Sequence, residues 1–143
     1  MSPEVIVNDM LPLYRRLSTD DQDSVRLLTV QDLVAMAEKL GPAETQQLLL
    51  PSICATFQDK SWRVRYMAAD HFVQLASAVD ENVIKEDLVS AFINLMRDAE
   101  AEVRTAAAGQ IPGLAKLLDQ TTIIERLLPV TKELADDLSQ HVR

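Results

Sequence analysis

Apolar residues recur at helical spacing along the whole chain, in segments that are joined by short polar turns. Ser2 is suited to cap the first of these segments, and Gly41 followed by Pro42 ends the second, as glycine and proline commonly do after a helix. The pattern predicts an all-α chain with helices over about 2–17, 24–39, 43–57, 61–79, 83–96, 100–118 and 123–135, then a turn and the start of another helix.

The predicted helices form pairs that repeat with a fixed period of 39 residues. Val64-Arg65 recurs one period earlier and at the next two periods, without a gap. A fixed period of this size is typical of a solenoid, in which stacked helix pairs share one continuous core. We therefore predict three full helix pairs and half of a fourth, with units over about 3–41, 42–80, 81–119 and 120–143.

Proline occupies one column of the first helices, at Pro12, Pro51 and Pro129, with Ser90 as the exception. A proline inside a helix removes one backbone hydrogen bond, so we expect each first helix to be kinked there.

The second helix of the third unit contains Gly109, Pro112 and Gly113. Proline in a helix interior costs about 3 kcal/mol and glycine about 1 kcal/mol, so we expect this helix to be bent or broken near Gln110.

Composition and charge narrow the class of protein. Hydrophobic residues make up 48% of the chain, which is enough for a continuous core, and the net charge of −8 argues against nucleic-acid binding. No apolar run approaches the length of a membrane span and no secretory signal is visible, so we expect no membrane partner. The single cysteine, Cys54, suits a reducing compartment, either cytoplasmic or nuclear.

Aspartate and arginine keep the same 39-residue period across the turn within each pair. Each arginine follows the aspartate of its own unit by six residues, and a planar guanidinium can join two aspartates through charge-assisted hydrogen bonds. Because a partner would not follow the repeat, regular recurrence favours a structural ladder over a binding site. The predicted ladder comprises Asp20, Arg26, Asp59, Arg65, Asp98, Arg104 and Asp137.

The amino-acid sequence of the turns is more specific to one family than the repeat period is. The run Asp-Lys-Ser-Trp-Arg-Val-Arg-Tyr-Met over 59–67 resembles the scaffold (A, regulatory) subunits of protein phosphatase 2A, as do the turns around 21–28 and 99–104. The helix pairs resemble HEAT repeats, and the resemblance covers almost the whole chain. It implies a HEAT-repeat α-solenoid, and it places the chain near the middle of a longer array.

The resemblance also implies a function. In this family the turns within the helix pairs form a ridge that binds a regulatory (B-type) subunit, while the catalytic subunit binds farther toward the C-terminal end, outside this stretch. Trp62 and Arg63 occupy columns without large apolar residues, so we expect them to contact the partner rather than the core. Lys60 on the same turn, with Asp21 and Glu100 on the neighbouring turns, completes the predicted surface.

Nothing in the sequence indicates catalysis or a cofactor. There is no phosphate-binding loop and no metal-binding motif, and His71 and His141 stand alone. We therefore expect a non-catalytic scaffold without cofactor or metal. Two alternatives are a HEAT-repeat nuclear transport receptor or another helical-repeat adaptor, and an iron-dependent HEAT-repeat hydroxylase, whose paired His-Glu motifs are absent.

The two ends of the array lack the polar outer faces that terminal repeats usually carry. Leu127, Leu128 and Leu134 lie on the last predicted helix, whose partner helix is incomplete. We expect these uncapped ends to favour self-association.

Overall fold

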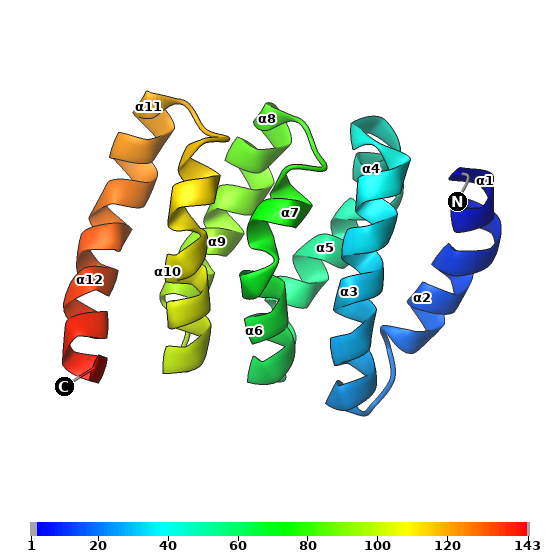
Figure 1. The fold of residues 1–143 in the computed structure, drawn as a ribbon, viewed down its shortest axis with the longest axis horizontal. Coiled ribbons are helices and arrows are strands. Elements are labelled where there is room, and N and C mark those ends of the chain that lie inside the picture. Colours follow the sequence, from blue (N-terminus) through cyan, green and yellow to red (C-terminus); the bar gives the residue numbers. More distant parts are fainter. Residues whose placement is uncertain (1–2, 143) are drawn as a thin grey trace.

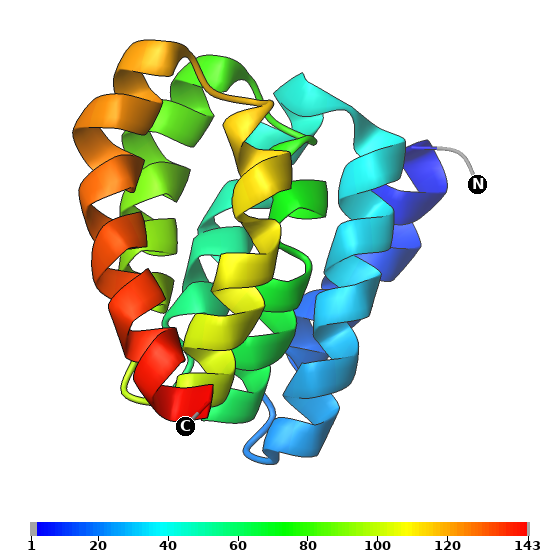
Figure 2. The same ribbon diagram turned by 60° about the vertical axis from the view of Figure 1, so that its left-hand side comes forward.

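The computed structural model describes residues 3–142, and all side chains in that range except those of residues 3, 6, 7 and 137–142. The helices stack side by side in two layers, one formed by the first helix of each unit and the other by the second (Figure 1). The turns within units lie along one edge, and the connections between units lie along the opposite edge (Figures 1 and 2). The predicted all-α solenoid of stacked helix pairs is therefore confirmed. Ser2, the predicted helix cap, lies outside the described residues.

The first helix of each unit is interrupted before the proline column. A π-helical turn precedes this column in units 1, 3 and 4, and in unit 2 a turn at Leu49 divides the helix. The interruption lies just before the column at which proline was expected to kink the helix, and unit 3 shows that serine at this column is compatible with it. The segments are α1 (Pro3–Val5), η1 (Ile6–Met10) and α2 (Leu11–Leu17); α4 (Pro42–Leu48) and α5 (Leu50–Phe57); α8 (Glu81–Val83), η2 (Ile84–Leu88) and α9 (Val89–Met96); and α11 (Gln120–Thr122), η3 (Ile123–Leu127) and α12 (Leu128–Val142).

The second helices differ from the prediction in where one of them breaks. In unit 1, α3 (Asp23–Leu40) is continuous, whereas in unit 2 His71 separates α6 (Trp62–Asp70) from α7 (Phe72–Ala76). In unit 3, α10 (Ala101–Ala115) runs unbroken through Gly109, Pro112 and Gly113, so the predicted break near Gln110 is wrong.

Contacts between units 2 and 3 explain why the break falls at His71. The break frees the backbone N–H of Val73, which donates instead to the side-chain oxygen of Gln110 on α10 at 3.0 Å. A Cβ added to Gly113 would lie 2.9 Å from a methyl group of Val73, so glycine allows α10 to approach α7 closely. Gly113 and Gln110 therefore serve packing against the neighbouring unit.

The fourth unit lacks the predicted turn after Ala135, because α12 continues as one helix to Val142. In the complete units, an arginine of the second helix donates to the backbone carbonyl of the turn aspartate, as Arg65 does to Asp59 at 2.7 Å.

The core follows the 39-residue columns. Leu33 and Phe72 are equivalent positions of the second helices, and neither has any exposed surface. We call the contact between units 1 and 2 the first seam and that between units 2 and 3 the second seam. Three rings meet at tilted angles in the second seam, where the centroid of Phe72 lies 5.1 Å from that of Phe57 and 4.8 Å from that of Phe92.

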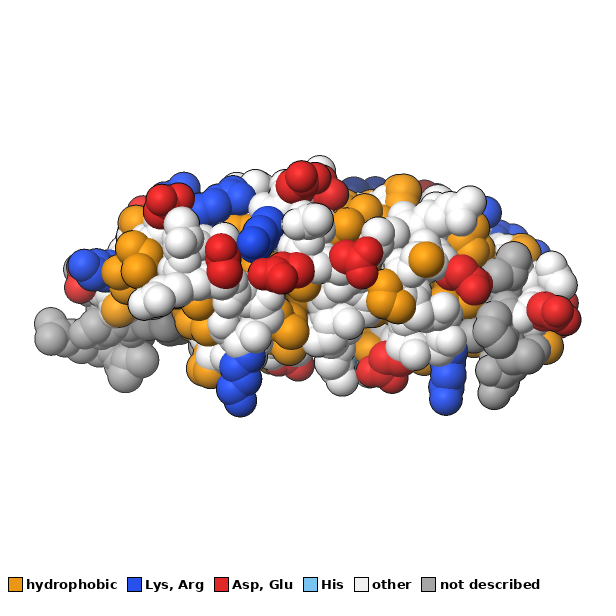
Figure 3. All heavy atoms as spheres, turned by 90° about the horizontal axis from the view of Figure 1, so that it is seen from above, with side chains coloured by type: hydrophobic (Ala, Val, Ile, Leu, Met, Phe, Trp, Pro, Cys, Tyr) orange, Lys and Arg blue, Asp and Glu red, His pale blue; other side chains and the backbone are white. Residues whose placement is uncertain are grey.

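The edge that carries the connections between units shows acidic, basic and hydrophobic side chains interspersed (Figure 3). In the described part of the chain, no helix combines the length and the apolar character required to cross a membrane.

Candidate protein-binding surface

The turns within units have the same local structure in all three complete units. In each, the side-chain Oδ1 of the turn aspartate accepts a hydrogen bond from the backbone N–H two residues later, as aspartate commonly does in turns. These distances are 2.8 Å from Gln22 to Asp20, 2.9 Å from Ser61 to Asp59 and 3.0 Å from Glu100 to Asp98. The aspartate column therefore shapes the chain reversal before each second helix.

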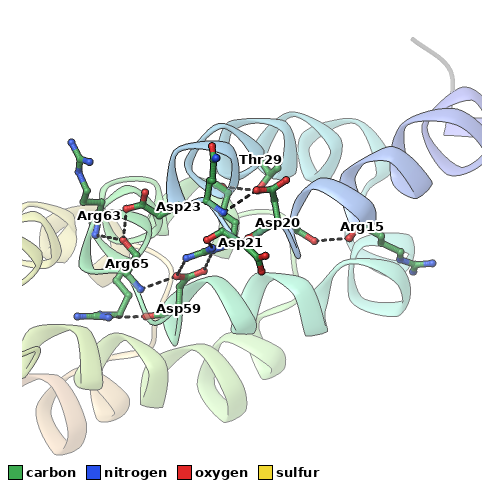
Figure 4. Close-up of polar contacts among 12 residues, drawn as sticks. Arg15, Asp20, Asp21, Asp23, Thr29, Asp59, Arg63 and Arg65 are labelled. Carbon is green, nitrogen blue, oxygen red and sulfur yellow. Dashed lines mark hydrogen bonds and ion pairs between the residues drawn. The ribbon is translucent and has the colours of Figure 1, made fainter.

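Arginine side chains join each turn to the next. Arg26 donates through Nε and Nη2 to the two carboxylate oxygens of Asp59, at 2.9 and 3.0 Å, and through Nη1 to the backbone carbonyl of Asp20 at 2.7 Å (Figure 4). Arg26 is 7% exposed, so this paired contact is largely shielded from water. The hydrogen bonds to Asp59 raise the pKa of Arg26 and keep it charged.

The arginine contact between units 2 and 3 is built in the same way, and we call each such contact a rung. Arg65 donates to both carboxylate oxygens of Asp98, at 2.7 and 3.1 Å, and to the backbone carbonyl of Asp59. Each rung thus joins the carboxylate of the following unit to a carbonyl of its own unit, rather than two carboxylates as the sequence suggested. Arg104 donates to the carbonyl of Asp98 at 2.6 Å, and the side chain of Asp137 lies outside the described residues.

Trp62 and Arg63 begin α6 and face outward from this ladder. The hydroxyl of Ser61 caps α6 by accepting from the backbone N–H of Arg63 at 3.3 Å, and it donates to Asp23 of unit 1 at 2.9 Å. Trp62 is 39% exposed, and Arg63 points away from the ladder contacts (Figure 4). The turn is therefore fixed by its neighbours, whereas its largest side chains remain available to a partner.

A shallow groove of about 340 Å³ runs over the start of α6. Tyr66, one helical turn after Trp62, is also 39% exposed. Sequence reasoning missed Tyr66 because an aromatic residue at helical spacing resembles a core position. The groove is lined by Leu27, Trp62, Arg63, Tyr66, Met67 and Glu102.

The remaining predicted contact residues lie on the same edge. Lys60 and Asp21 are exposed, and Glu100 is half-buried beside the start of α10. The backbone carbonyl of Asp21 also accepts from Arg26 at 3.1 Å. Asp21, Lys60 and Glu100 lie in the turns within units, and Trp62 and Arg63 are the first two residues of α6. These turns lie along one edge of the array (Figure 1).

No cluster of three or more potential metal ligands occurs among the residues whose side chains are described. The half-buried ring of His71 lies with Nδ1 at 2.9 Å from the carbonyl of Met67, which satisfies it within its own helix. Cys54 is half-buried, and burial raises the pKa of its thiol, so the reactive thiolate is disfavoured. The side chain of His141 lies outside the described residues.

Comparison with known proteins gives two kinds of match. A family model described as a PPP2R1A-like HEAT repeat matches residues 81–143, and a HEAT-repeat model matches residues 49–79. The chain is 46% identical over 82 residues to the regulatory A subunit of protein phosphatase PP2A from Schizosaccharomyces pombe, and 39% identical over 73 residues to that of Saccharomyces cerevisiae. These matches cover 57% and 49% of this chain, but only 14% and 12% of the two relatives.

Proposed function

We propose that this chain acts as a non-catalytic scaffold of a phosphatase 2A, because it is a HEAT-repeat array related to the regulatory A subunits of that enzyme. It binds a regulatory (B-type) subunit through the edge formed by its intra-unit turns, and so helps to assemble the holoenzyme. The catalytic subunit binds through units that lie outside this chain.

The observation that carries this proposal is the outward position of Trp62 and Arg63 on a turn that is fixed by other contacts. Ser61 ties the turn to Asp23, and the Asp59 carboxylate ties it to Arg26. A pre-organised surface loses little conformational entropy when a partner binds, and tryptophan and arginine are the residue types most enriched among binding hot spots.

The charges along this edge indicate how a partner would complement it. Lys60 and Arg63 make the turn of unit 2 basic, between the acidic turns that carry Asp21 and Glu100. A partner that places an apolar side chain in the groove beside Trp62, acidic groups opposite Arg63 and basic groups on either side would match this order. Such a pattern favours one register of the partner along the array.

The test is binding of a purified B-type regulatory subunit to the immobilised chain, by calorimetry or biolayer interferometry. Trp62→Ala should weaken binding at least tenfold, and Arg63→Ala should weaken it several-fold. Arg16→Ala removes an exposed arginine from α2, in the layer of first helices, and serves as the matched control, which should bind as the unaltered chain does.

Melting temperatures must be measured on the same samples. Unchanged affinity in Trp62→Ala, or a loss that is matched by Arg16→Ala, would refute the proposed surface. Capture of phenylalanine-rich nucleoporin peptides in place of phosphatase subunits would instead support a transport receptor.

We also propose that the ends of this chain self-associate. Val5 and Leu13 at the first unit are 40% and 47% exposed, and Ile124 and Leu128 at the fourth are 52% and 42% exposed. Apolar side chains exposed in this way favour association. Light scattering should show a mass that rises with concentration, and a constant monomer mass would contradict the proposal.

A further inference from the structure

A second, separate cavity opens at the first seam, on the side of the first helices. Its volume is about 360 Å³, which is within the range of small-ligand pockets. The exposed residues Arg15, Thr19 and Pro51 form its mouth, and the buried side chains of Tyr14 and Thr56 lie deeper. The cavity is therefore a recess with a buried floor, away from the groove beside Trp62.

The 39-residue period explains why this cavity exists. Ser18 and Thr56 line it, and the equivalent positions one unit later are Phe57 and Leu95. Phe57 and Leu95 are 4% and 1% exposed, so in the second seam they fill the corresponding space. The first seam thus lacks a ring and a branched aliphatic side chain that its neighbour possesses.

Four of the hydroxyl groups in the lining donate to helix carbonyls, and Ser52 is hydrogen-bonded to Tyr14. Thr29 donates to Arg26 at 2.6 Å, and Thr56 donates to Ile53 at 2.6 Å. Ser18 and Thr19 donate in the same way, to the carbonyls of Arg15 and Arg16 at 3.1 and 3.0 Å. A hydroxyl oxygen that donates once retains lone pairs, so the lining offers hydrogen-bond acceptors.

We propose that this cavity binds an aromatic ring that carries a hydrogen-bond donor, with a phenol as the simplest case. The ring takes the place that Phe57 fills in the second seam, against the apolar surface of Pro51, Ala55 and Val64. Its hydroxyl donates to the threonine oxygens of the floor. A free phenolic compound and the tyrosine side chain of a partner share this chemistry. An aromatic carboxylate lacks the donor. Arg26 is already paired with Asp59, and Arg15 lies at the exposed mouth, so a carboxylate should not bind at the floor of the cavity.

The experiment is a two-dimensional amide NMR titration of the full chain with 4-methylphenol. Saturable shifts should appear at the amides of Tyr14, Ser52 and Thr56, whereas 4-methylbenzoate should produce none. N-acetyl-tyrosinamide separates the two sources: saturable binding indicates a partner's tyrosine, and binding of 4-methylphenol alone indicates a free phenol.

Two variants test the geometry and the chemistry separately. Thr56→Leu introduces the leucine that stands at the equivalent position, Leu95, in the second seam. It should raise the melting temperature and weaken the binding of 4-methylphenol at least tenfold. Thr56→Val keeps the shape of the side chain and removes the acceptor. It should therefore weaken the binding of 4-methylphenol but leave the binding of toluene unchanged. Thr105→Leu, on the exposed face of α10, is the matched control and should leave binding intact.

The absence of saturable shifts in the unaltered chain would overturn the proposal. So would persistent binding in a folded Thr56→Leu variant, or equal binding of 4-methylbenzoate. If Thr56→Leu does not fold, Thr56→Val decides, because a threonine-to-valine change leaves the volume of the side chain almost unaltered.

Discussion

The two seams between the complete units are joined by the same kind of arginine rung but are filled differently. In the second seam, the rings of Phe57, Phe72 and Phe92 meet at tilted angles. The equivalent positions of the first seam are Ser18, Leu33 and Ile53, and a cavity of about 360 Å³ opens beside them.

The opposite side of the array repeats this contrast. In the second seam Gly113 lies against Val73, whereas the equivalent of Gly113 in the first seam is Gln74. Gln74 lines another open space, of about 440 Å³, between α3 and α7. The rung therefore sets the register of the array, while the filling of each seam decides how tightly two units are held.

The largest effect should come from truncating the centre of the second seam. We expect Phe72→Ala to lower the free energy of unfolding by about 3–5 kcal/mol, because it removes a fully buried ring that contacts two others. Leu33→Ala, the equivalent change in the first seam, should cost about 2 kcal/mol, at the lower end for such changes. Urea unfolding of both variants measures the difference, and an equal or larger loss in Leu33→Ala would contradict the contrast.

The rungs should behave alike in the two seams. Arg26→Ala and Arg65→Ala should each lower the free energy of unfolding by about 1–2 kcal/mol, because each removes paired hydrogen bonds to a shielded carboxylate. Arg65→Lys retains the charge but not the paired geometry, so it should recover only part of the loss. Clearly unequal losses in Arg26→Ala and Arg65→Ala would contradict this prediction. The difference between the seams would then arise from the rungs and not from the side chains that fill them.

The two glycines of α10 should respond to alanine with opposite signs. No atom lies within 4 Å of a Cβ added at Gly109, so Gly109→Ala should stabilise the chain by up to about 1 kcal/mol through helix propensity. At Gly113 the added Cβ would overlap Val73 in the second seam, and the gain should be lost or reversed. Thermal unfolding distinguishes the two, and an equal gain at Gly113 would show that the second seam is looser than described.

A pH dependence arises at the first seam, from the buried phenol of Tyr14. Burial raises the pKa of Tyr14 to about 12, from a usual value of 10.0, although a hydrogen bond with Ser52 opposes the shift. Because the folded-state pKa is the higher one, the neutral phenol stabilises the fold fully below about pH 10, and this stabilisation is lost as the pH rises toward 12.

Tyr14→Phe should therefore lose less stability than the unaltered chain between about pH 9 and about pH 11.5, as measured by urea unfolding at each pH. An identical loss of stability in the two proteins would mean that a group other than Tyr14 titrates.

Much of the fold was predictable because the same environment recurs every 39 residues, so the aspartate and arginine columns revealed the period directly. The sequence failed where a contact from the next unit overrides local preference. The break at His71 and the continuity of α10 both depend on Gln110 and Gly113 meeting Val73 across the second seam. Helix propensity, which considers one helix at a time, assigned the break to the wrong unit.

The candidate site was predictable to a similar extent. Trp62 and Arg63 could be selected because their columns contain no large apolar residue elsewhere. Leu27 and Tyr66, which complete the groove, could not, since apolar residues at helical spacing normally indicate a core face. The cavity of the first seam was visible only once the two seams could be compared in three dimensions.

The hydrogen bond from the backbone of Val73 to the side chain of Gln110 limits how far these repeats can be treated as interchangeable modules. The equivalents of Gln110 in the preceding units are Asp32, whose side chain is one methylene shorter, and His71, whose acceptor is a ring nitrogen, so neither places an acceptor where Gln110 does. An engineer who shuffled the repeats, or averaged them into a consensus, would leave an amide in unit 2 unsatisfied. Units 2 and 3 should therefore be transplanted together, as a single block of two repeats.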